Sequence, residues 1–166
     1  RKCRTACRCP CSDRHRSERA PMTTFHNLQA SQIKTGDKLP EFALPITARL
    51  VVSAAIATQD FQDVHHDKAA AQEKGTPDIF MNILSTNGFV GRYLTDWAGP
   101  GSRIKKIRFN LGAPNYPGDT MIMRGEVEEL TEENGHTLVH LDFRGKNGMG
   151  NHVSGSAVVQ LAGESA

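Results

Sequence analysis

The sequence predicts an α+β fold in which an antiparallel sheet wraps around one long helix. Residues 76–101 carry the longest helical pattern of the chain, whereas apolar residues after Gly101 recur at every second position, as in half-buried strands. Turn sequences divide this second part into four segments. A chain of 166 residues is long enough for one domain with a real core and short for two. We therefore expect a single domain.

Residues 1–21 differ in composition from the rest of the chain. They contain all four cysteines and seven Arg or Lys residues against two acidic ones, a local net charge of +5 in a chain whose total is +2. Large apolar side chains are almost absent, so burial cannot offset the entropy of ordering, and we expect a disordered extension.

Three interpretations of this extension remain open. The cysteines form a zinc site, although their C-x3-C-x-C-x-C spacing is atypical; the arginines form a nucleic-acid-binding arm; or a mis-set gene start has added upstream sequence. We favour the third, because Met22 opens a stretch typical of a protein start. The domain is therefore assigned to residues 22–166.

The composition of residues 22–166 excludes several classes of function. There is no cysteine in this range, which removes thiol catalysis and disulfide bonds. No apolar run approaches the roughly 20 residues of a membrane helix, and no apolar segment near the N-terminus suits a secretory signal. We expect a cytoplasmic protein that binds neither membrane nor nucleic acid.

Ahead of the long helix, the sequence predicts turns and two short helices. Glycine and proline residues within 31–48 indicate turns and one short strand. Residues 51–61 suit a short helix. Residues 67–75 suit a second one, with Asp67 as its N-cap and Gly75 at its C-terminal end.

The long helix is predicted over residues 76–101. Asp78 is its expected N-cap, and the sequence AGPG ends it. One face is marked by apolar residues at helical spacing: Ile79, Ile83, Val90 and Leu94. Gly88 and Gly91 lie inside the pattern at a cost of about 1 kcal/mol each. They predict that a sheet or a ligand approaches the helix closely.

The strands are predicted at residues 102–112, 120–130, 136–146 and 152–162. An irregular step in the first of them indicates a β-bulge. The sequence Glu-Asn-Gly at 133–135 is a strong hairpin turn, and 146–151 contains another.

One loop gathers the titratable side chains that suggest chemistry. The sequence TQDFQDVHHD, residues 58–67, contains three aspartates and two histidines. Only four residues separate Asp60 from His65, so both side chains can reach one small volume and orient a water there. The spacing alone leaves three interpretations open: a catalytic acid–base pair, a solvated loop, or a metal site built on His65, His66 and Asp67.

This loop resembles the signature of MaoC-like, or R-specific, enoyl-CoA hydratases, Asp-x-Asn-Pro-(Ile/Leu)-His. The segment DFQDVH matches it at Asp60 and His65, with Gln62 and Asp63 in place of Asn and Pro. The later sequence NYPGD resembles the family's hydrophobic-Gly-Asp turn, and the order of elements also matches. The resemblance implies the hot-dog fold, in which a sheet wraps a long helix.

Three longer segments narrow the resemblance: QDFQDVHHD, PDIFMNIL and RYLTDWAGP. They are similar to segments of the short subunit of heteromeric MaoC-like hydratases used in bacterial steroid side-chain degradation. This implies hydration of a 2-enoyl-CoA with a cholesterol- or bile-acid-type side chain. It also implies a partner, either a second MaoC-like subunit or a second copy of this chain. No metal or other cofactor is implied, because CoA is part of the substrate and its thioester supplies the activation.

The resemblance also implies roles for single residues. Asp60 and His65 are the expected catalytic pair, and which of them is the base stays open. Asn82 corresponds to a family glycine whose backbone N–H helps to hold the thioester oxygen. Basic residues on the following strand are the expected ligands of the CoA phosphates: Arg103, Lys105 and Arg108. A solvated strand face explains this basic set equally well.

Two other functions compete with hydration, a non-catalytic acyl-CoA-binding subunit and a hot-dog thioesterase. The intact Asp60 and His65 argue against the first, and the hydratase-like signature disfavours the second. The fold alone does not separate them.

Overall fold

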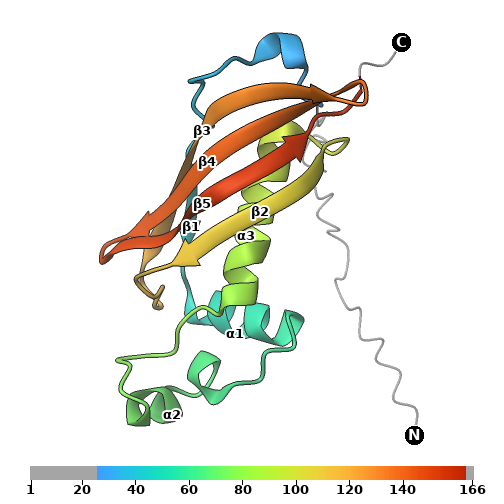
Figure 1. Ribbon diagram of the computed structural model, residues 1–166. Coiled ribbons are helices and arrows are strands. Elements are labelled where there is room, and N and C mark those ends of the chain that lie inside the picture. The colour runs from blue at the N-terminus through green and yellow to red at the C-terminus, as the bar shows by residue number, and fades with distance from the viewer. Residues whose placement is uncertain (1–25, 164–166) are drawn as a thin grey trace, which may run out of the picture.

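A curved antiparallel sheet packs against the long helix α3 (Ile83–Ala98), and the short helices within residues 48–73 gather at the N-terminal end of that helix (Figure 1). The computed structural model describes residues 26–163. The expectations for residues 1–21 concern a part of the chain outside this range. The elements in chain order are η1 (Ala30–Gln32), β1 (Phe42–Pro45), α1 (Ala48–Ala57), η2 (Asp63–His65), α2 (Lys68–Glu73), α3 (Ile83–Ala98), β2 (Arg103–Leu111), β3 (Thr120–Glu133), β4 (His136–Asn147) and β5 (Gly150–Gln160).

The strands form one sheet in the order β1-β3-β4-β5-β2, and every neighbouring pair is antiparallel. The four predicted strands and the α+β class are confirmed. Asn134 and Gly135 have φ values of 53° and 75°, the backbone that a two-residue hairpin turn requires. The register of β2 against β5 shifts between Ile104 and Lys106, which confirms the predicted bulge.

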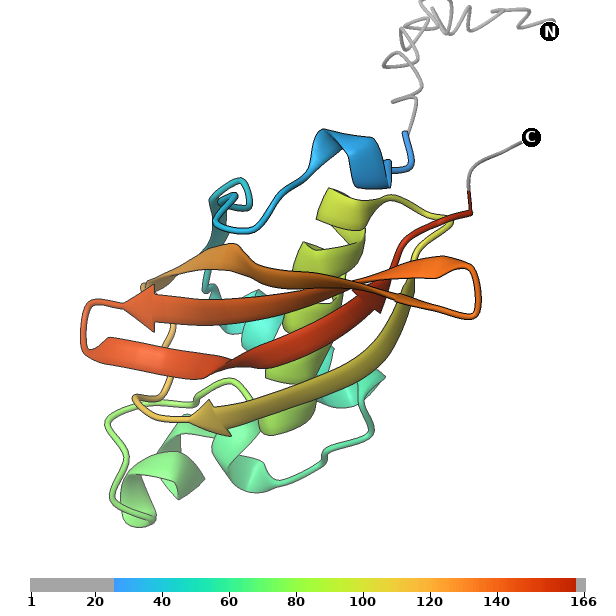
Figure 2. The ribbon, with the colours of Figure 1, turned by 45° about the horizontal axis from the view of Figure 1, so that its top comes forward.

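The core lies between the sheet and α3, which crosses one face of the sheet (Figure 2). Val90 and Leu94 of α3 are completely buried. Strand residues of the same cluster are equally buried: Met121, Met123, Leu141, Phe143 and Val153. Burying one such side chain contributes about 1.5–3 kcal/mol to folding. The sheet therefore holds α3, and with it the first turn of that helix, in a fixed position.

The helix α3 begins at Ile83, later than predicted. Its N-cap is Asn82, whose side chain accepts a hydrogen bond from the backbone N–H of Ser85. The prediction of Asp78 as the cap is wrong. The Asp78 carboxylate instead pairs with the ammonium group of Lys68 at 2.8 Å.

The residues before α3 hydrogen-bond to distant parts of the chain. The N–H of Phe80 donates to the carbonyl of Val64 at 3.3 Å, and that of Met81 to the carbonyl of Asn115 at 3.1 Å. These bonds connect the segment just before α3 to the loops that contain Val64 and Asn115. Ile83, predicted on the buried face, is 52% exposed.

Of the two glycines predicted to allow a close approach, Gly91 lies against β2. A Cβ added there would be 3.9 Å from Cδ1 of Ile104, an ordinary contact. Gly88 has no neighbour within 4 Å in the described part of the chain, so this side of α3 is open in the single subunit. No helix within residues 26–163 is both long and apolar enough to cross a membrane.

Candidate active site

His65 ends the short η2 turn and is fixed by one strong hydrogen bond. Its Nδ1 lies 2.7 Å from the backbone carbonyl of Phe80, which only accepts. In the neutral ring Nδ1 therefore carries the proton, and Nε2 is left as an acceptor. The Phe80 ring meets the imidazole edge-on at a centroid distance of 5.0 Å. His65 is 5% exposed, so its orientation and tautomer are set by the protein.

Asp60 follows the end of α1, where the chain reverses sharply. Gln59 has a φ of 57°, and the N–H of Asp60 donates to the carbonyl of Ala55 at 2.9 Å. This turn places Oδ2 of Asp60 3.4 Å from Nε2 of His65. The structure thus brings the two predicted residues together, with side chains 15% and 6% exposed.

The two facing atoms are both acceptors when the ring is neutral. A carboxylate oxygen and a bare imidazole nitrogen do not attract each other, so the pair favours a donor that serves both, or a proton on Nε2. A water that donates to both atoms meets the first condition. Once Nε2 is protonated, it pairs with the Asp60 carboxylate. The site can therefore accept one proton and return it.

Asn82 lies beside this pair at the start of α3 and is 3% exposed. Its Nδ2 donates to Oδ2 of Asp60 at 2.9 Å and to Oγ1 of Thr58 at 3.0 Å. Its backbone N–H has no hydrogen-bond partner among residues 26–163. That N–H lies at the positive end of a 16-residue helix, where developing negative charge is favoured. The sequence did not predict the side-chain contacts of Asn82, although an Asn just before an apolar helical run is an N-cap signal.

The other titratable residues of the loop have local partners. Nε2 of His66 lies 3.2 Å from the carbonyl of Phe61, and the Asp67 carboxylate caps α2 as predicted. Asp63 lies 3.9 Å from the ammonium of Lys74. Within the described residues no group of three or more His, Cys, Asp or Glu side chains is placed to hold a metal ion. The described residues therefore contain no ligand cluster that would support a metal site in this loop.

The basic residues predicted for CoA lie on β2, an edge strand. Arg108 lines a groove on the outer face of the sheet with Lys106 and His140. Nζ of Lys105 bonds to a side chain of the neighbouring strand, and Arg103 is exposed at the start of β2. None of the three lies in hydrogen-bond or ion-pair contact with Asp60 within the described chain.

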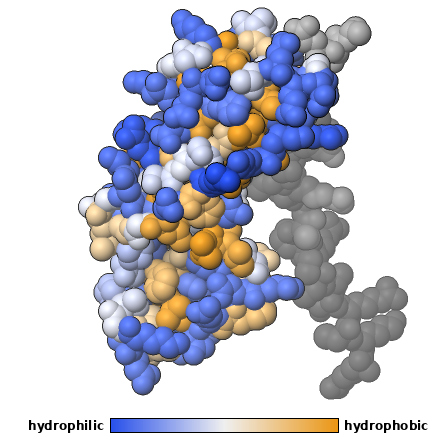
Figure 3. Space-filling view, viewed as in Figure 1, coloured by the Kyte–Doolittle hydropathy of each residue, from blue (hydrophilic) through white to orange (hydrophobic). Residues whose placement is uncertain are grey.

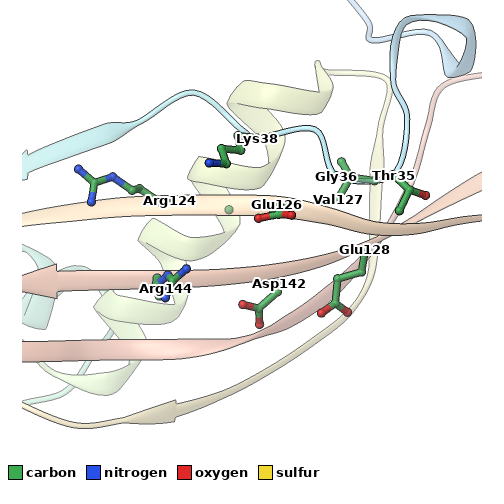
Figure 4. Close-up of a pocket in the computed structure, with 10 residues that line it drawn as sticks. Thr35, Gly36, Lys38, Arg124, Glu126, Val127, Glu128, Asp142 and Arg144 are labelled. Atoms are coloured by element: carbon green, nitrogen blue, oxygen red, sulfur yellow. The ribbon is translucent and has the colours of Figure 1, made fainter.

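A groove of about 530 Å³ also lies away from the Asp60–His65 pair. It is formed by the loop before β1 and the outer face of β3 and β4 (Figure 4). Its charged lining residues are of both signs: Lys38, Arg124, Arg144, Glu126, Glu128 and Asp142. Neither Asp60 nor His65 lines this groove.

Apolar side chains are exposed on the segments that carry Asp60 and Asn82. Phe61 is 66% exposed, Ile56 58% and Leu84 49%. Figure 3 shows apolar surface between the sheet and the short helices. An exposed apolar area beside buried polar groups is typical of a surface that another molecule covers.

A second buried histidine ties β5 to the first turn of α3, and the sequence did not single it out. Nε2 of His152 lies 2.9 Å from Oγ1 of Thr86, and Nδ1 lies 2.7 Å from the carbonyl of Ala113. Burial lowers the pKa of His152 from its ordinary value of 6.5, against the opposing effects of that carbonyl and of Asp119. The folded protein therefore favours a neutral ring that donates from Nδ1 and accepts from Thr86.

This pKa shift predicts acid sensitivity of the fold. Above pH 6.5 the ring is neutral in both states; as pH falls through 6.5, the unfolded chain binds a proton that the folded protein resists, so stability declines. We expect the free energy of unfolding, from denaturant titrations at about pH 7.5 and about pH 5.5, to fall less in His152→Gln than in the wild type. Thr86→Val removes the donor to Nε2, so it should lower the free energy of unfolding most at about pH 7.5, where the ring is neutral. If the free energy of unfolding falls as much in His152→Gln as in the wild type, His152 is not the source of the acid sensitivity.

Comparison with known proteins agrees with this geometry. The model of the MaoC like domain matches residues 32–142. The chain is 45% identical over 127 residues to the 3-oxo-4,17-pregnadiene-20-carboxyl-CoA hydratase beta subunit of Mycobacterium tuberculosis, covering 76% of this chain and 94% of that protein.

Solved structures give the same result. The structure is similar to the ChsH1-ChsH2 complex of Mycobacterium tuberculosis, with a TM-score of 0.72 and 43% identity over 77% of this chain and 98% of that one. R-hydratase PhaJ1 of Pseudomonas aeruginosa gives a TM-score of 0.73 at 22% identity, over 81% of this chain and 85% of that one, and so shows the shared hot-dog fold. On the family model and the 45% identity, the chain belongs to the MaoC-like domain family.

Proposed function

We propose that this chain is the catalytic short subunit of a heteromeric hydratase, which adds water across the 2,3 double bond of a steroid side-chain 2-enoyl-CoA. The observation that carries the proposal is the pair of acceptors Nε2 of the buried His65 and Oδ2 of the partly buried Asp60, 3.4 Å apart. They lie beside the backbone N–H of Asn82, which has no hydrogen-bond partner among residues 26–163. A pair that binds one water next to an oxyanion donor suits addition of water to an activated double bond.

The reaction uses one water molecule and two proton transfers, one from the water to the pair and one from the pair to Cα. The water donates its hydrogen atoms to Nε2 of His65 and Oδ2 of Asp60, which leaves an oxygen lone pair free to attack Cβ. One of the two groups takes a proton as the C–O bond forms. The pair then delivers a proton to Cα, so that the hydroxyl and hydrogen of one water are added in full. Because Nδ1 is bonded to the Phe80 carbonyl, an imidazolium formed at Nε2 remains held at both ends.

Negative charge develops on the thioester oxygen during attack. The backbone N–H of Asn82 and the N-terminus of α3 are the proposed partners of that oxygen. A pre-positioned donor of this kind contributes about 3–4 kcal/mol to transition-state stabilisation. No cofactor enters the proposed reaction, since the thioester itself makes Cβ electrophilic.

The proposed partner is a second MaoC-like subunit. β2 is an edge strand of nine residues without proline, and such an edge offers unpaired backbone groups to another chain. Beside it, α3 exposes Leu84 and the open position Gly88. The similar protein of Mycobacterium tuberculosis is a beta subunit, and the similar structure is a two-protein complex. We propose that the partner covers this face, encloses the acyl group and, as acyl-CoA metabolism implies, assembles with the chain in the cytoplasm.

The function is tested with the full chain, alone and with a MaoC-like partner protein. We expect the complex to remove the enoyl-thioester absorbance of a steroid side-chain enoyl-CoA and to yield a product heavier by one water. Release of free CoA thiol would indicate a thioesterase, and an inactive complex would indicate a non-catalytic subunit. Either outcome would overturn the proposal.

The subunit interface is tested separately. Leu84→Asp places a charge on the exposed apolar start of α3, so association with the partner should weaken by about 10-fold or more, measured by analytical ultracentrifugation. Arg144→Asp makes a charge change on the outer face of the sheet and is the matched control. Equal affinities of the two variants would contradict the proposed interface.

A further inference from the structure

We propose that the side chain of Asn82 is a positioning residue for Asp60, and that one amide both caps α3 and holds the catalytic carboxylate. This inference rests on the proposed hydratase function. It concerns the amide group of Asn82, whereas the oxyanion role above concerns its backbone N–H. The two roles use different atoms and are separable by substitution.

The hydrogen bonds fix the orientation of the amide. Oδ1 accepts from the backbone N–H of Ser85 at 2.8 Å, and that partner only donates. The oxygen must therefore face the helix and the nitrogen must face Asp60. Nδ2 then uses both of its hydrogens, on Asp60 at 2.9 Å and on Thr58 at 3.0 Å. A flipped amide would lose all three bonds in a side chain that is only 3% exposed.

Thr58 has the polarity that this arrangement requires. Its Oγ1 lies 2.8 Å from the carbonyl of Ala54, to which it donates within the last turn of α1. An oxygen lone pair is then free to accept from Asn82. The turn that carries Asp60 is thus joined to the start of α3 at two points, the hydroxyl of Thr58 and the carboxylate itself.

Asp60 depends on this amide for its orientation. Its other oxygen, Oδ1, has one contact, the backbone N–H of Gln62 at the long distance of 3.4 Å. No Lys or Arg among residues 26–163 forms an ion pair with Asp60. The terminal torsion of an aspartate is soft, so without a donor the carboxylate can rotate. The Nδ2 bond keeps Oδ2 on the side of His65, where the proposed water binds.

Two substitutions separate positioning from capping. Asn82→Ser keeps a good N-cap oxygen but is too short to reach Asp60, and Asn82→Asp keeps the shape and the cap but turns the donor into an acceptor. Both retain the backbone N–H at position 82. Since misplacement by about 1 Å costs about 10²-fold, we expect kcat of Asn82→Ser to fall about 10- to 100-fold and that of Asn82→Asp further. KM should change little.

Thr47→Ala is the matched control, because Thr47 caps α1 through the backbone N–H of Leu50 and has no bond to Asp60. It should lower the thermal midpoint without changing kcat. The decisive measurement is a double-mutant cycle with Asp60→Asn in the assembled complex. If Asn82 acts through Asp60, Asn82→Ser should have little further effect in the Asp60→Asn background.

The outcomes distinguish this inference from the function it rests on. Wild-type kcat in Asn82→Ser, or full additivity with Asp60→Asn, would overturn the positioning role while leaving the hydratase proposal intact. If Asp60→Asn alone leaves kcat unchanged, the result contradicts the proposed function itself. A loss of kcat in Asn82→Ser that is coupled to Asp60, with the thermal midpoint kept, supports the inference.

Discussion

Asp60→Asn and His65→Gln are each expected to lower kcat of the assembled hydratase by about 10²- to 10⁴-fold, the range for loss of a general acid or base. Asparagine keeps the shape of aspartate but cannot take the proton of the attacking water. Glutamine keeps a polar group yet cannot exchange a proton at the position of Nε2. Because both residues are proposed to bind the same water, the double variant should lose little more activity than the worse single variant.

The same loop provides matched controls for this experiment. Asp63→Asn and His66→Gln change the same residue types, and both side chains form local contacts, with Lys74 and with the carbonyl of Phe61. Their kcat should stay within about two-fold of the wild type, since exposed loop substitutions rarely have larger effects. Wild-type kcat in Asp60→Asn or His65→Gln, with the complex intact, would show that the catalytic assignment is wrong.

The sheet was predictable because its information is local. Alternating apolar residues mark each strand, and Glu-Asn-Gly supplies the positive φ values of the first hairpin. The start of α3 was not predictable in this way. Asp78 has the chemistry of a cap, but its carboxylate pairs with Lys68, and the backbone N–H groups of Phe80 and Met81 donate to distant parts of the chain; the helix begins at Ile83. Tertiary hydrogen bonds outweighed a local propensity there.

In the candidate site, too, the contacts between residues close in sequence were predictable and those between distant residues were not. Asp60 and His65 lie five positions apart, so the loop spacing and the family resemblance were enough to predict them as a pair. The bond from Asn82 to Asp60 spans 22 positions, and the bond between Thr86 and His152 spans 66. No spacing rule connects such pairs, because the packing of α3 against the sheet creates them. The basic residues of β2 remain a prediction, since the single chain does not bring them to Asp60.

The second large effect is expected at Gly155, in the middle of β5. This residue pairs with Phe109 of β2 and Phe143 of β4. A Cβ at Gly155 would overlap the carbonyl oxygen of Arg108 and lie 2.6 Å from Cα of Phe109. Both are backbone atoms, which no side-chain rotation can move aside. Gly155→Ala must therefore push β2 away from β5, at a cost of about 3 kcal/mol, the upper end of the usual overpacking penalty.

Thermal unfolding of Gly155→Ala measures this cost, and we expect a midpoint lower by about 6–12 °C for a chain of this size. Gly148→Ala, in the turn between β4 and β5, is the control, because a Cβ there has no neighbour within 4 Å. Since β2 is an edge strand whose partner among residues 26–163 is β5, the distortion should also reach the proposed subunit interface. The β2 amides of Gly155→Ala should therefore exchange hydrogen faster and the partner should bind more weakly, whereas equal midpoints in the two variants would contradict the close approach of β2.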